Sequence, residues 1–255
     1  MNLRSYLFSI KQYLLNRSAC HEMKRFKNIH KGERCFIIGT GPSLTTEDLE
    51  LLKDEITFGS NRIFEIYPRT SWRPTYYINQ DYPLILKFAE EIDKLETRAL
   101  FLPMDVREKF AHNPLASFFV LRHRDFYPKD ADFSTHLHHY MGQGMTVTYG
   151  AIQMAYYMGF SEVYLLGIDH NYSISLDAKG IPVINEGVKD YFKGSTASNQ
   201  GLNLPRVAES TLAYMTARKF ADRQKNFAVY NATRGGKLEA FERVKLEDIL
   251  ARKRN

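Results

Sequence analysis

Short apolar runs alternate with stretches of helical spacing along most of the chain. The apolar runs lack the strict alternation of a half-exposed strand, which is typical of strands buried on both faces of a sheet. They lie at residues 35–38, 56–58, 75–78, 99–102, 163–166 and 228–230. Helical spacing occurs at residues 47–52, 84–95, 146–157 and 207–224, and near Lys245. Strands that alternate with helices predict an α/β fold, a Rossmann-like, mainly parallel sheet flanked by helices.

An amphipathic helix is predicted within residues 1–30. Its apolar residues at helical spacing are Leu3, Leu7, Ile10 and Leu14. Basic side chains surround them, so the helix either contacts an anionic membrane through residues 1–28, or packs on the body of the protein or on a second copy in a homo-oligomer.

A second departure from the strand and helix alternation lies at residues 104–142. This range is rich in aromatic and basic residues and is predicted to form a lid-like insertion. The Rossmann-like domain is therefore expected at residues 31–250, and residues 251–255 form a basic tail.

Composition and charge narrow the class of protein. The chain has 255 residues, 44% hydrophobic and 25% charged, which suits one large globular domain. Its net charge of +6 comes mostly from the two ends, so a nucleic-acid partner is not predicted. Only Cys20 and Cys35 are present, which favours a reducing compartment over a disulfide framework. Because no run of about 18 apolar residues occurs, we expect a cytoplasmic protein, peripheral at the inner face of the membrane if the first helix binds lipid.

Polar residues and glycines follow the carboxyl ends of the predicted strands. In a parallel sheet these ends meet at one edge, where ligands bind. The residues at these ends that we assign to a nucleotide-binding and catalytic site are Gly39, Thr40, Gly41, Pro42, Ser43, Asn61, Arg62, Asn79, Asp81, Gly167, Asp169, His170, Asn231 and Thr233.

The loop Gly39-Thr40-Gly41-Pro42-Ser43 is the first turn from strand to helix. Its glycines allow a tight turn and a close approach to a ligand, and amides at the start of the next helix favour a phosphate. The alternative is an ordinary turn with Ser43 as the helix cap. The loop lacks the third glycine of a dinucleotide fingerprint and the Gly-Lys-Ser/Thr end of a P-loop, which disfavours hydride transfer and Walker-type ATP hydrolysis.

The other strand-end residues each have two interpretations. Asn61 and Asn79 can donate and accept hydrogen bonds, which suits a base edge or a ribose, but asparagine also forms turns. Asp81 and Asp169 can hold a divalent cation with phosphate oxygens or act as acid or base, and either can instead cap a helix or pair with an arginine.

Three further groups complete the candidate chemistry. Thr146 and Thr148 begin a helix, where they either cap its amides or help those amides to hold an anion. Tyr191 either places a phenol beside a leaving phosphate or is a buried aromatic. Asp169, His170 and Tyr191 are therefore the catalytic candidates. The spacing of His136, His138 and His139 approaches a zinc pattern, but histidines in such a loop are more typically solvated or face a substrate, and no metal site is predicted.

Residues 35–44, 57–63, 146–170 and 230–238 together resemble one known family. That family is called domain of unknown function 115, or MptE-like, after the archaeal 6-hydroxymethylpterin diphosphokinase. The resemblance covers roughly residues 30–250 and implies a diphosphokinase that uses ATP. In such an enzyme Asp81 and Asp169 would hold Mg²⁺.

The Gly-Pro-Ser loop, the strand-end asparagines and the Leu-Gly-Ile-Asp turn also resemble the Cst-type bacterial sialyltransferases, which use a CMP-sugar without a metal. The resemblance implies that Asn61 and Asn79 contact the cytidine or its phosphate, and that residues 146–148 face the donor sugar. It also implies that four loop residues line the nucleotide, namely Gly39, Gly41, Pro42 and Ser43. Residues 185–191, where those enzymes carry a histidine base, contain no histidine here.

Three functional hypotheses follow. The leading one is a nucleotide-sugar-dependent glycosyltransferase in surface polysaccharide synthesis, with a CMP-activated acidic sugar, a glycan or lipid-linked acceptor and no cofactor. The second is the MptE-like diphosphokinase with Mg²⁺. The third is a nucleotide-binding protein without catalytic activity.

Overall fold

An eight-stranded, all-parallel sheet forms the centre of the protein. The computed structural model describes residues 7, 10–11, 14–15, 17–192 and 202–252. The strand order is β12-β11-β8-β1-β2-β3-β4-β5, and every pair is parallel. The strands are β1 (Arg34–Ile38), β2 (Thr57–Ser60), β3 (Tyr76–Ile78), β4 (Ala99–Pro103), β5 (Ala116–Phe119), β8 (Glu162–Leu166), β11 (Ala228–Asn231) and β12 (Glu242–Arg243). The predicted parallel α/β fold is confirmed.

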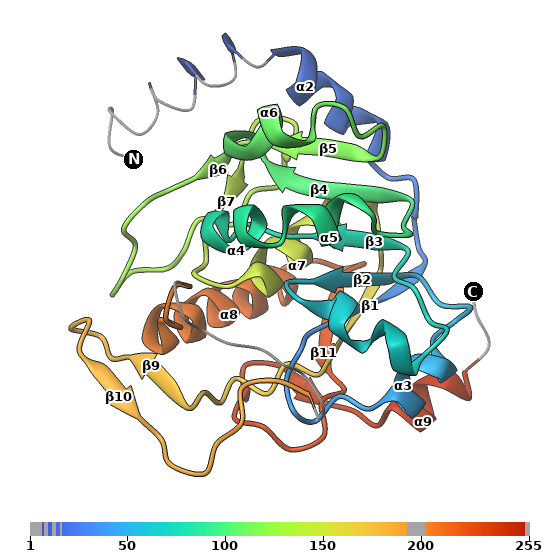
Figure 1. The fold of residues 1–255 in the computed structure, drawn as a ribbon, viewed down its shortest axis with the longest axis vertical. Helices are drawn as coiled ribbons and strands as arrows, with labels where there is room; N and C mark the ends of the chain where they lie inside the picture. Colours follow the sequence, from blue (N-terminus) through green and yellow to red (C-terminus); the bar gives the residue numbers. More distant parts are fainter. Residues whose placement is uncertain (1–6, 8–9, 12–13, 16, 193–201, 253–255) are drawn as a thin grey trace.

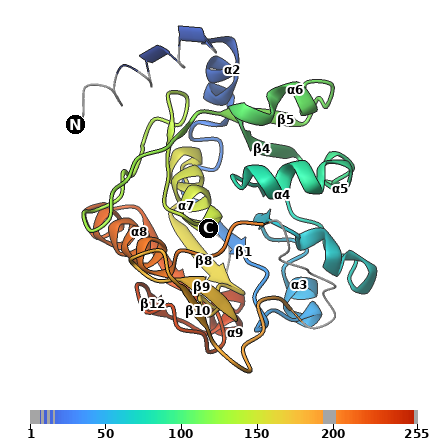
Figure 2. The ribbon, with the colours of Figure 1, turned by 60° about the vertical axis from the view of Figure 1, so that its left-hand side comes forward.

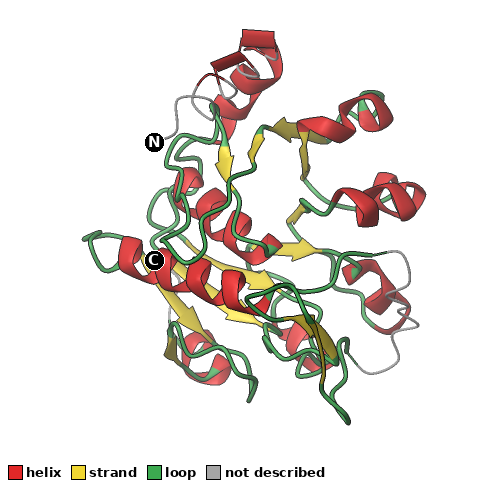
Figure 3. Ribbon diagram, turned by 90° about the vertical axis from the view of Figure 1, so that its left-hand side faces the viewer, coloured by secondary structure: helices red, strands yellow, loops and turns green. Residues whose placement is uncertain are grey.

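Helices cover both faces of the sheet. The longest two, α7 (Val147–Met158) and α8 (Val207–Ala221), lie side by side on one face (Figures 1 and 2). The opposite face carries α3 (Thr46–Leu51), α4 (Tyr82–Lys87), α5 (Ala89–Asp93) and α9 (Leu246–Leu250), so helices stand on both sides of the strands (Figure 3). Two separate cores result, because successive strand residues point to opposite faces. In β1, Ile37 enters one core and Ile38 the other, which explains the continuous apolar runs.

Some predicted helices differ in detail from the structure. The spacing of residues 84–95 predicts one helix, but α4 and α5 are separated at Phe88, which has φ −117°. The Phe88 ring packs against Phe64 and beneath the guanidinium of Arg62, so tertiary contacts set the break. By contrast, α7 agrees with the predicted range 146–157 to within one residue, and it ends at Gly159, whose φ of 91° places it in the left-handed region.

Part of the predicted insertion belongs to the sheet. Strand β5 pairs in parallel with β4 and forms the sheet edge, after the short elements η3 (Met104–Val106) and α6 (Arg107–Phe110). Its run of Ala, Ser and two Phe was obscured by the aromatic residues around it. The strands β6 (Leu121–Arg122) and β7 (Met141–Gly142) form a separate small sheet.

Gln153 of α7 fastens the rest of this range to the body. Its Oε1 accepts hydrogen bonds from the amides of Ser134 and Gly142, both at 2.9 Å. Its Nε2 donates to the Gly142 carbonyl at 2.8 Å, and the side chain is fully buried. Because an amide side chain matches these backbone groups on both sides, the segment is held as part of the core domain.

Among its described residues, the N-terminal segment packs on the body through its last turns. After α2 (Arg17–Glu22), the element η1 (Met23–Phe26) buries Met23 and Phe26 in the core, and Arg25 donates to Ser117 Oγ at 2.9 Å. Its earlier apolar side chains are exposed, at Leu7, Ile10, Leu14 and Leu15. Leu3 and Arg4 lie outside the described residues. No described helix combines the length and the apolar character needed to cross a bilayer.

A hairpin lies in the long connection between β8 and α8. Strands β9 (Ile174–Leu176) and β10 (Pro182–Ile184) pair antiparallel and extend away from the central sheet (Figure 1). Asp190 ties the base of the hairpin, because its carboxylate accepts from the amide and hydroxyl of Ser173 at 2.7 and 2.6 Å.

Replacing Gln153 with methionine tests the anchoring of the insertion. The substitution keeps the volume but leaves three backbone groups without partners, so we expect the free energy of unfolding to fall by roughly 2–5 kcal/mol. Urea denaturation measures this loss, and faster amide exchange in residues 131–142 locates it. Gln224→Met is the matched control, because Gln224 makes only marginal contacts of 3.5 Å. Equal stability of the two variants would contradict the anchoring role.

Candidate functional site

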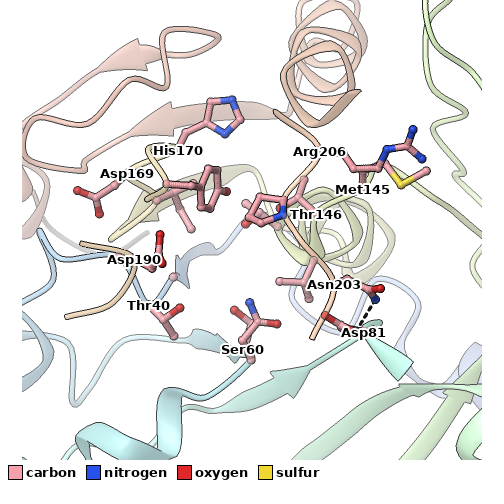
Figure 4. Close-up of a pocket in the computed structure, with 18 of the residues that line it drawn as sticks. Thr40, Ser60, Asp81, Met145, Thr146, Asp169, His170, Asp190, Asn203 and Arg206 are labelled. Carbon is pink, nitrogen blue, oxygen red and sulfur yellow. Dashed lines mark hydrogen bonds between the residues drawn. The ribbon is translucent and has the colours of Figure 1, made fainter. Parts of the chain in front are cut away.

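A cavity of about 600 Å³ opens at the carboxyl ends of β1, β2, β3 and β8. This is where the strand order reverses, with β2 and β8 on either side of β1. Many predicted site residues line it, namely Gly39, Thr40, Gly41, Asn61, Asp81, Thr146, Thr148, Gly167, Asp169, His170 and Tyr191. Figure 4 shows Asp169 and His170 on one side of the cavity and Ser60 and Asp81 on the other. Its size suits a small ligand such as a nucleotide.

Other predicted residues stand behind the cavity wall. Pro42, Ser43, Arg62, Asn79, Asn231 and Thr233 do not line it. Asn79 is fully buried, where its Oδ1 accepts from the Asp81 amide at 3.0 Å. Asn231 donates to the Leu238 carbonyl at 2.8 Å and accepts from the Thr233 amide at 3.0 Å. These asparagines shape the strand ends that carry the lining residues.

The glycines of the first loop are required by a close contact within the protein. A Cβ on Gly39 would lie 2.3 Å from the Gly167 carbonyl oxygen, and one on Gly41 would lie 1.9 Å from Asp169 Oδ2. The loop amides are also used internally, because Gly39 donates to the Leu166 carbonyl at 2.8 Å and Gly41 donates to the Gly167 carbonyl at 3.0 Å. These two amides are therefore committed to the neighbouring loop and do not form a phosphate cradle.

The helix after this loop is capped by Thr45, and not by Ser43 as the sequence alternative had it. Thr45 and Asp48 form a reciprocal capping box, with both bonds at 3.2 Å. Ser43 instead donates its hydroxyl to Asp169 Oδ2 at 2.7 Å. Asp48 is also paired with Arg234, so the charge of this arginine is compensated by a buried carboxylate.

The start of α7 is the better place for an anion. This 12-residue helix begins inside the cavity, where Thr146, Val147 and Thr148 are lining residues. Thr146 occupies the cap position but makes no capping hydrogen bond, and its hydroxyl lies 3.2 Å from the Tyr214 hydroxyl. The Tyr149 amide donates to the Thr146 carbonyl at 3.2 Å. The amides of Val147 and Thr148 come before it, in the first turn, where a helix provides no acceptor and has the positive end of its dipole.

Backbone strain concentrates at the cavity. The four non-glycine residues with positive φ in the described chain are Asn28, Asn61, Met145 and His170, with φ between 50° and 59°. Three of them, all except Asn28, line the cavity. A side chain in the left-handed region costs free energy, and such residues persist where a site requires their direction.

Carboxylates dominate the charge of the cavity. Asp81, Asp169 and Asp190 line it, and burial raises the pKa of Asp81 and of Asp169. Asp81 also caps α4 and accepts from Asn203 at 3.0 Å, as the dashed line in Figure 4 marks. Among the described lining residues the one Lys or Arg side chain is Arg206, whose Nε lies 2.8 Å from Glu209 Oε1.

Two predicted residues form a stacked group beside the cavity. The Arg62 guanidinium lies 4.6 Å from the centre of the Phe88 ring and 5.7 Å from that of Tyr191, and it is ion-paired with Glu65. Burial raises the pKa of the Tyr191 phenol, while the nearby Arg62 lowers it. Tyr191 therefore lines the cavity as a neutral phenol.

Several lining residues are not among those predicted from the sequence. Ser60, Gln80, Met145, Asp190, Asn203, Arg206 and Tyr214 were not predicted. Gln80 and Ser60 directly adjoin predicted strand-end residues, so the edge rule could have included them. Asn203, Arg206 and Tyr214 reach the cavity only through the tertiary path of the chain. Within the described residues, no three His, Cys, Asp or Glu side chains are grouped so that they could hold a metal ion.

The sheet and the cavity at its switch point define a Rossmann-like α/β protein. The chain belongs to the MptE-like family, because the family model for 6-hydroxymethylpterin diphosphokinase MptE-like matches residues 9–175. No curated protein matches the chain.

Two solved structures are similar to it. The MAf glycosyltransferase from Magnetospirillum magneticum AMB-1 is 16% identical with a TM-score of 0.51, and the match covers 93% of this chain and 41% of that chain. The sialyltransferase CstII from Campylobacter jejuni, in complex with the substrate analogue cytidine-5′-monophosphate, is 15% identical with a TM-score of 0.49, covering 84% and 85%. The first similarity shows a shared fold, and this chain spans less than half of the MAf protein.

Replacing Gly41 with alanine tests the close contact behind the cavity. The new Cβ would overlap Asp169 Oδ2 and approach the Gly167 carbonyl at 2.8 Å, so a backbone shift is needed. We expect a loss of about 1–3 kcal/mol in the free energy of unfolding, measured by urea denaturation. Gly150→Ala is the control, since its Cβ would meet chiefly the flexible end of Met141 and alanine favours a helix. A Gly41→Ala variant as stable as this control would show that the contact is not limiting.

Proposed function

We propose that this protein is a nucleotide-sugar-dependent glycosyltransferase that uses a CMP-activated acidic sugar in the synthesis of a surface glycan. The observation that carries the proposal is the start of α7 inside the cavity, next to the polar ends of β2 and β3. The helix start suits the donor phosphate, and the amide side chains of Asn61 and Gln80 suit the nucleoside.

The charge of the cavity supports a donor with a single phosphate. Asp81, Asp169 and Asp190 would repel a triphosphate, whereas the one helix start provides a site for one phosphate group. The shared fold with the MAf glycosyltransferase is consistent with glycosyl transfer. The donor identity itself comes from the sequence resemblance to the Cst-type enzymes.

A diphosphokinase is the second candidate, and family membership favours it. Asp81 and Asp169 line the same cavity, where they could contact a cation held by a nucleotide. However, both are already hydrogen-bonded, to Asn203 and Ser43, and the described residues do not form a three-ligand cation site. No step is therefore assigned to Mg²⁺. A nucleotide-binding protein without catalysis is the third candidate.

A thermal-shift screen against CMP, CMP-sugars, UDP, GDP and ATP, each with Mg²⁺ or with EDTA, separates these functions. A ligand that binds the native state raises the apparent stability. We expect CMP and CMP-sugars to raise the melting temperature of the protein in EDTA. When an acceptor is added to the protein with a CMP-sugar, we expect the donor to be cleaved and CMP to be released. Stabilisation by ATP only with Mg²⁺, with AMP release on a hydroxymethyl acceptor, would favour the diphosphokinase. Binding of CMP without any turnover across acceptors would favour the non-catalytic protein.

Asn61→Asp tests the nucleoside contact without disturbing the backbone. Aspartate tolerates positive φ almost as well as asparagine, but it removes the N–H donor and adds negative charge. We expect CMP affinity, measured by calorimetry, to fall roughly 10–100-fold, the effect of losing a hydrogen bond to a charged group. Asn28→Asp has the same chemical change at the same backbone conformation, away from the cavity, and should keep its affinity. Equal affinities would remove Asn61 from the site.

A further inference from the structure

His170 is held against α8 by one hydrogen bond of defined direction. Its Nε2 lies 2.7 Å from Thr211 Oγ1. The Thr211 hydroxyl donates to the Val207 carbonyl one turn earlier, at 2.8 Å. A hydroxyl has only one proton, so Thr211 must accept the hydrogen bond from His170. His170 Nε2 therefore carries the ring proton, and Nδ1 has the free lone pair.

The Nδ1 atom is a buried acceptor in a residue that lines the cavity. His170 lines the cavity and is 7% exposed, and Nδ1 is buried without a hydrogen-bond partner among the described residues. Tyr172 and Tyr214 face the imidazole edge-on, with centroid separations of 6.0 and 5.4 Å. A buried acceptor without a partner is costly, which indicates that a ligand completes it.

The surroundings keep the ring neutral. Burial lowers the pKa of His170 to about 4, so the lone pair is available at neutral pH. An anionic donor bound at the start of α7 would raise this pKa and strengthen the base when the substrate is present. Tyr214 lies between the start of α7 and His170, since its hydroxyl contacts Thr146 and its ring contacts His170.

We propose that His170 Nδ1 is the general base of the transfer reaction, and that Thr211 is a positioning residue that fixes the tautomer required for it. The assignment rests on the proposed glycosyl transfer. The acceptor oxygen forms a bond to the anomeric carbon as the bond from that carbon to the donor phosphate oxygen breaks. The bonding electrons leave with CMP, and the acceptor proton moves to Nδ1. This role accounts for the absence of histidine in residues 185–191.

Nitrogen NMR of histidine-labelled protein tests the tautomer without any need for activity. The eight histidines are separated by assigning His170 with a His170→Gln variant. We expect the His170 ring at pH 7 to carry its proton on Nε2, with a bare Nδ1, and the Thr211→Ser variant to retain this state. In Thr211→Val the Nε2 proton loses its acceptor, so we expect a mixture of tautomers or a shifted His170 pKa.

Thr216→Val is the matched control for this substitution. Thr216 lies on the same helix and is buried. Like Thr211 it donates to the carbonyl four residues earlier, at 2.9 Å, and it accepts a hydrogen bond from the Ala131 amide at 3.1 Å. Its loss should cost stability without changing the His170 spectrum. A proton on Nδ1 in the unmodified protein, or an unchanged spectrum in Thr211→Val, would overturn the positioning role.

Steady-state kinetics with the CMP-sugar donor then test the base. We expect His170→Gln to lower kcat about 10²–10⁴-fold, as loss of a general base does. Thr211→Val should lower kcat with little change in KM, and Thr211→Ser should recover it. Full activity of His170→Gln would overturn the base assignment. If the spectra are as expected but no CMP-sugar is bound or transferred, the tautomer lock is supported and the transferase proposal, with its base, is what fails.

Discussion

The close approach of two backbone loops is the constraint on which the cavity depends. The loop after β1 lies against the loop after β8, and Gly39 and Gly41 allow a separation that no side chain would fit. Hydrogen bonds from both glycine amides and from Ser43 close the contact. Because β1 and β8 are adjacent in the sheet, this contact sets the floor of the cavity and brings Asp169 and His170 to its wall. The tight turn is therefore required primarily by the packing of these two loops.

The same contact keeps the Asp169 carboxylate away from the start of α7, where we place the anion. Asp169 turns its carboxylate towards Ser43, where a phosphate would otherwise approach the first loop. The start of α7, across the cavity, then offers its first turn and the positive helix end. The ligand would thus extend from α7 towards β2 and β3, with the wall of β8 beside it. This geometry differs from a P-loop, in which the first turn itself surrounds the phosphate.

The sequence predicts what depends on periodicity and on strand ends. The parallel sheet, the helix α7 and the lining residues at the strand ends follow from buried runs and from the edge rule. Contacts between distant segments cannot be read from local sequence patterns. Strand β5 is therefore not distinguished from the aromatic residues around it. The hydrogen bonds of Gln153 to Ser134 and Gly142 are likewise not predicted. Asn79 and Asn231 share their residue type with Asn61, yet burial turns them into supports. Thr211, on an ordinary helical stretch, acquires its role only through the position of His170.

The positive φ angles of Asn61, Met145 and His170 also affect how the protein can change over evolutionary time. Each of these residues would fit its backbone better as glycine, so the cavity holds conformational free energy that substitution could release. Selection for thermal stability alone would therefore favour mutations at these three positions, and it would remove an amide, a thioether and an imidazole from the cavity wall. Stability and ligand recognition compete at the same places in the chain.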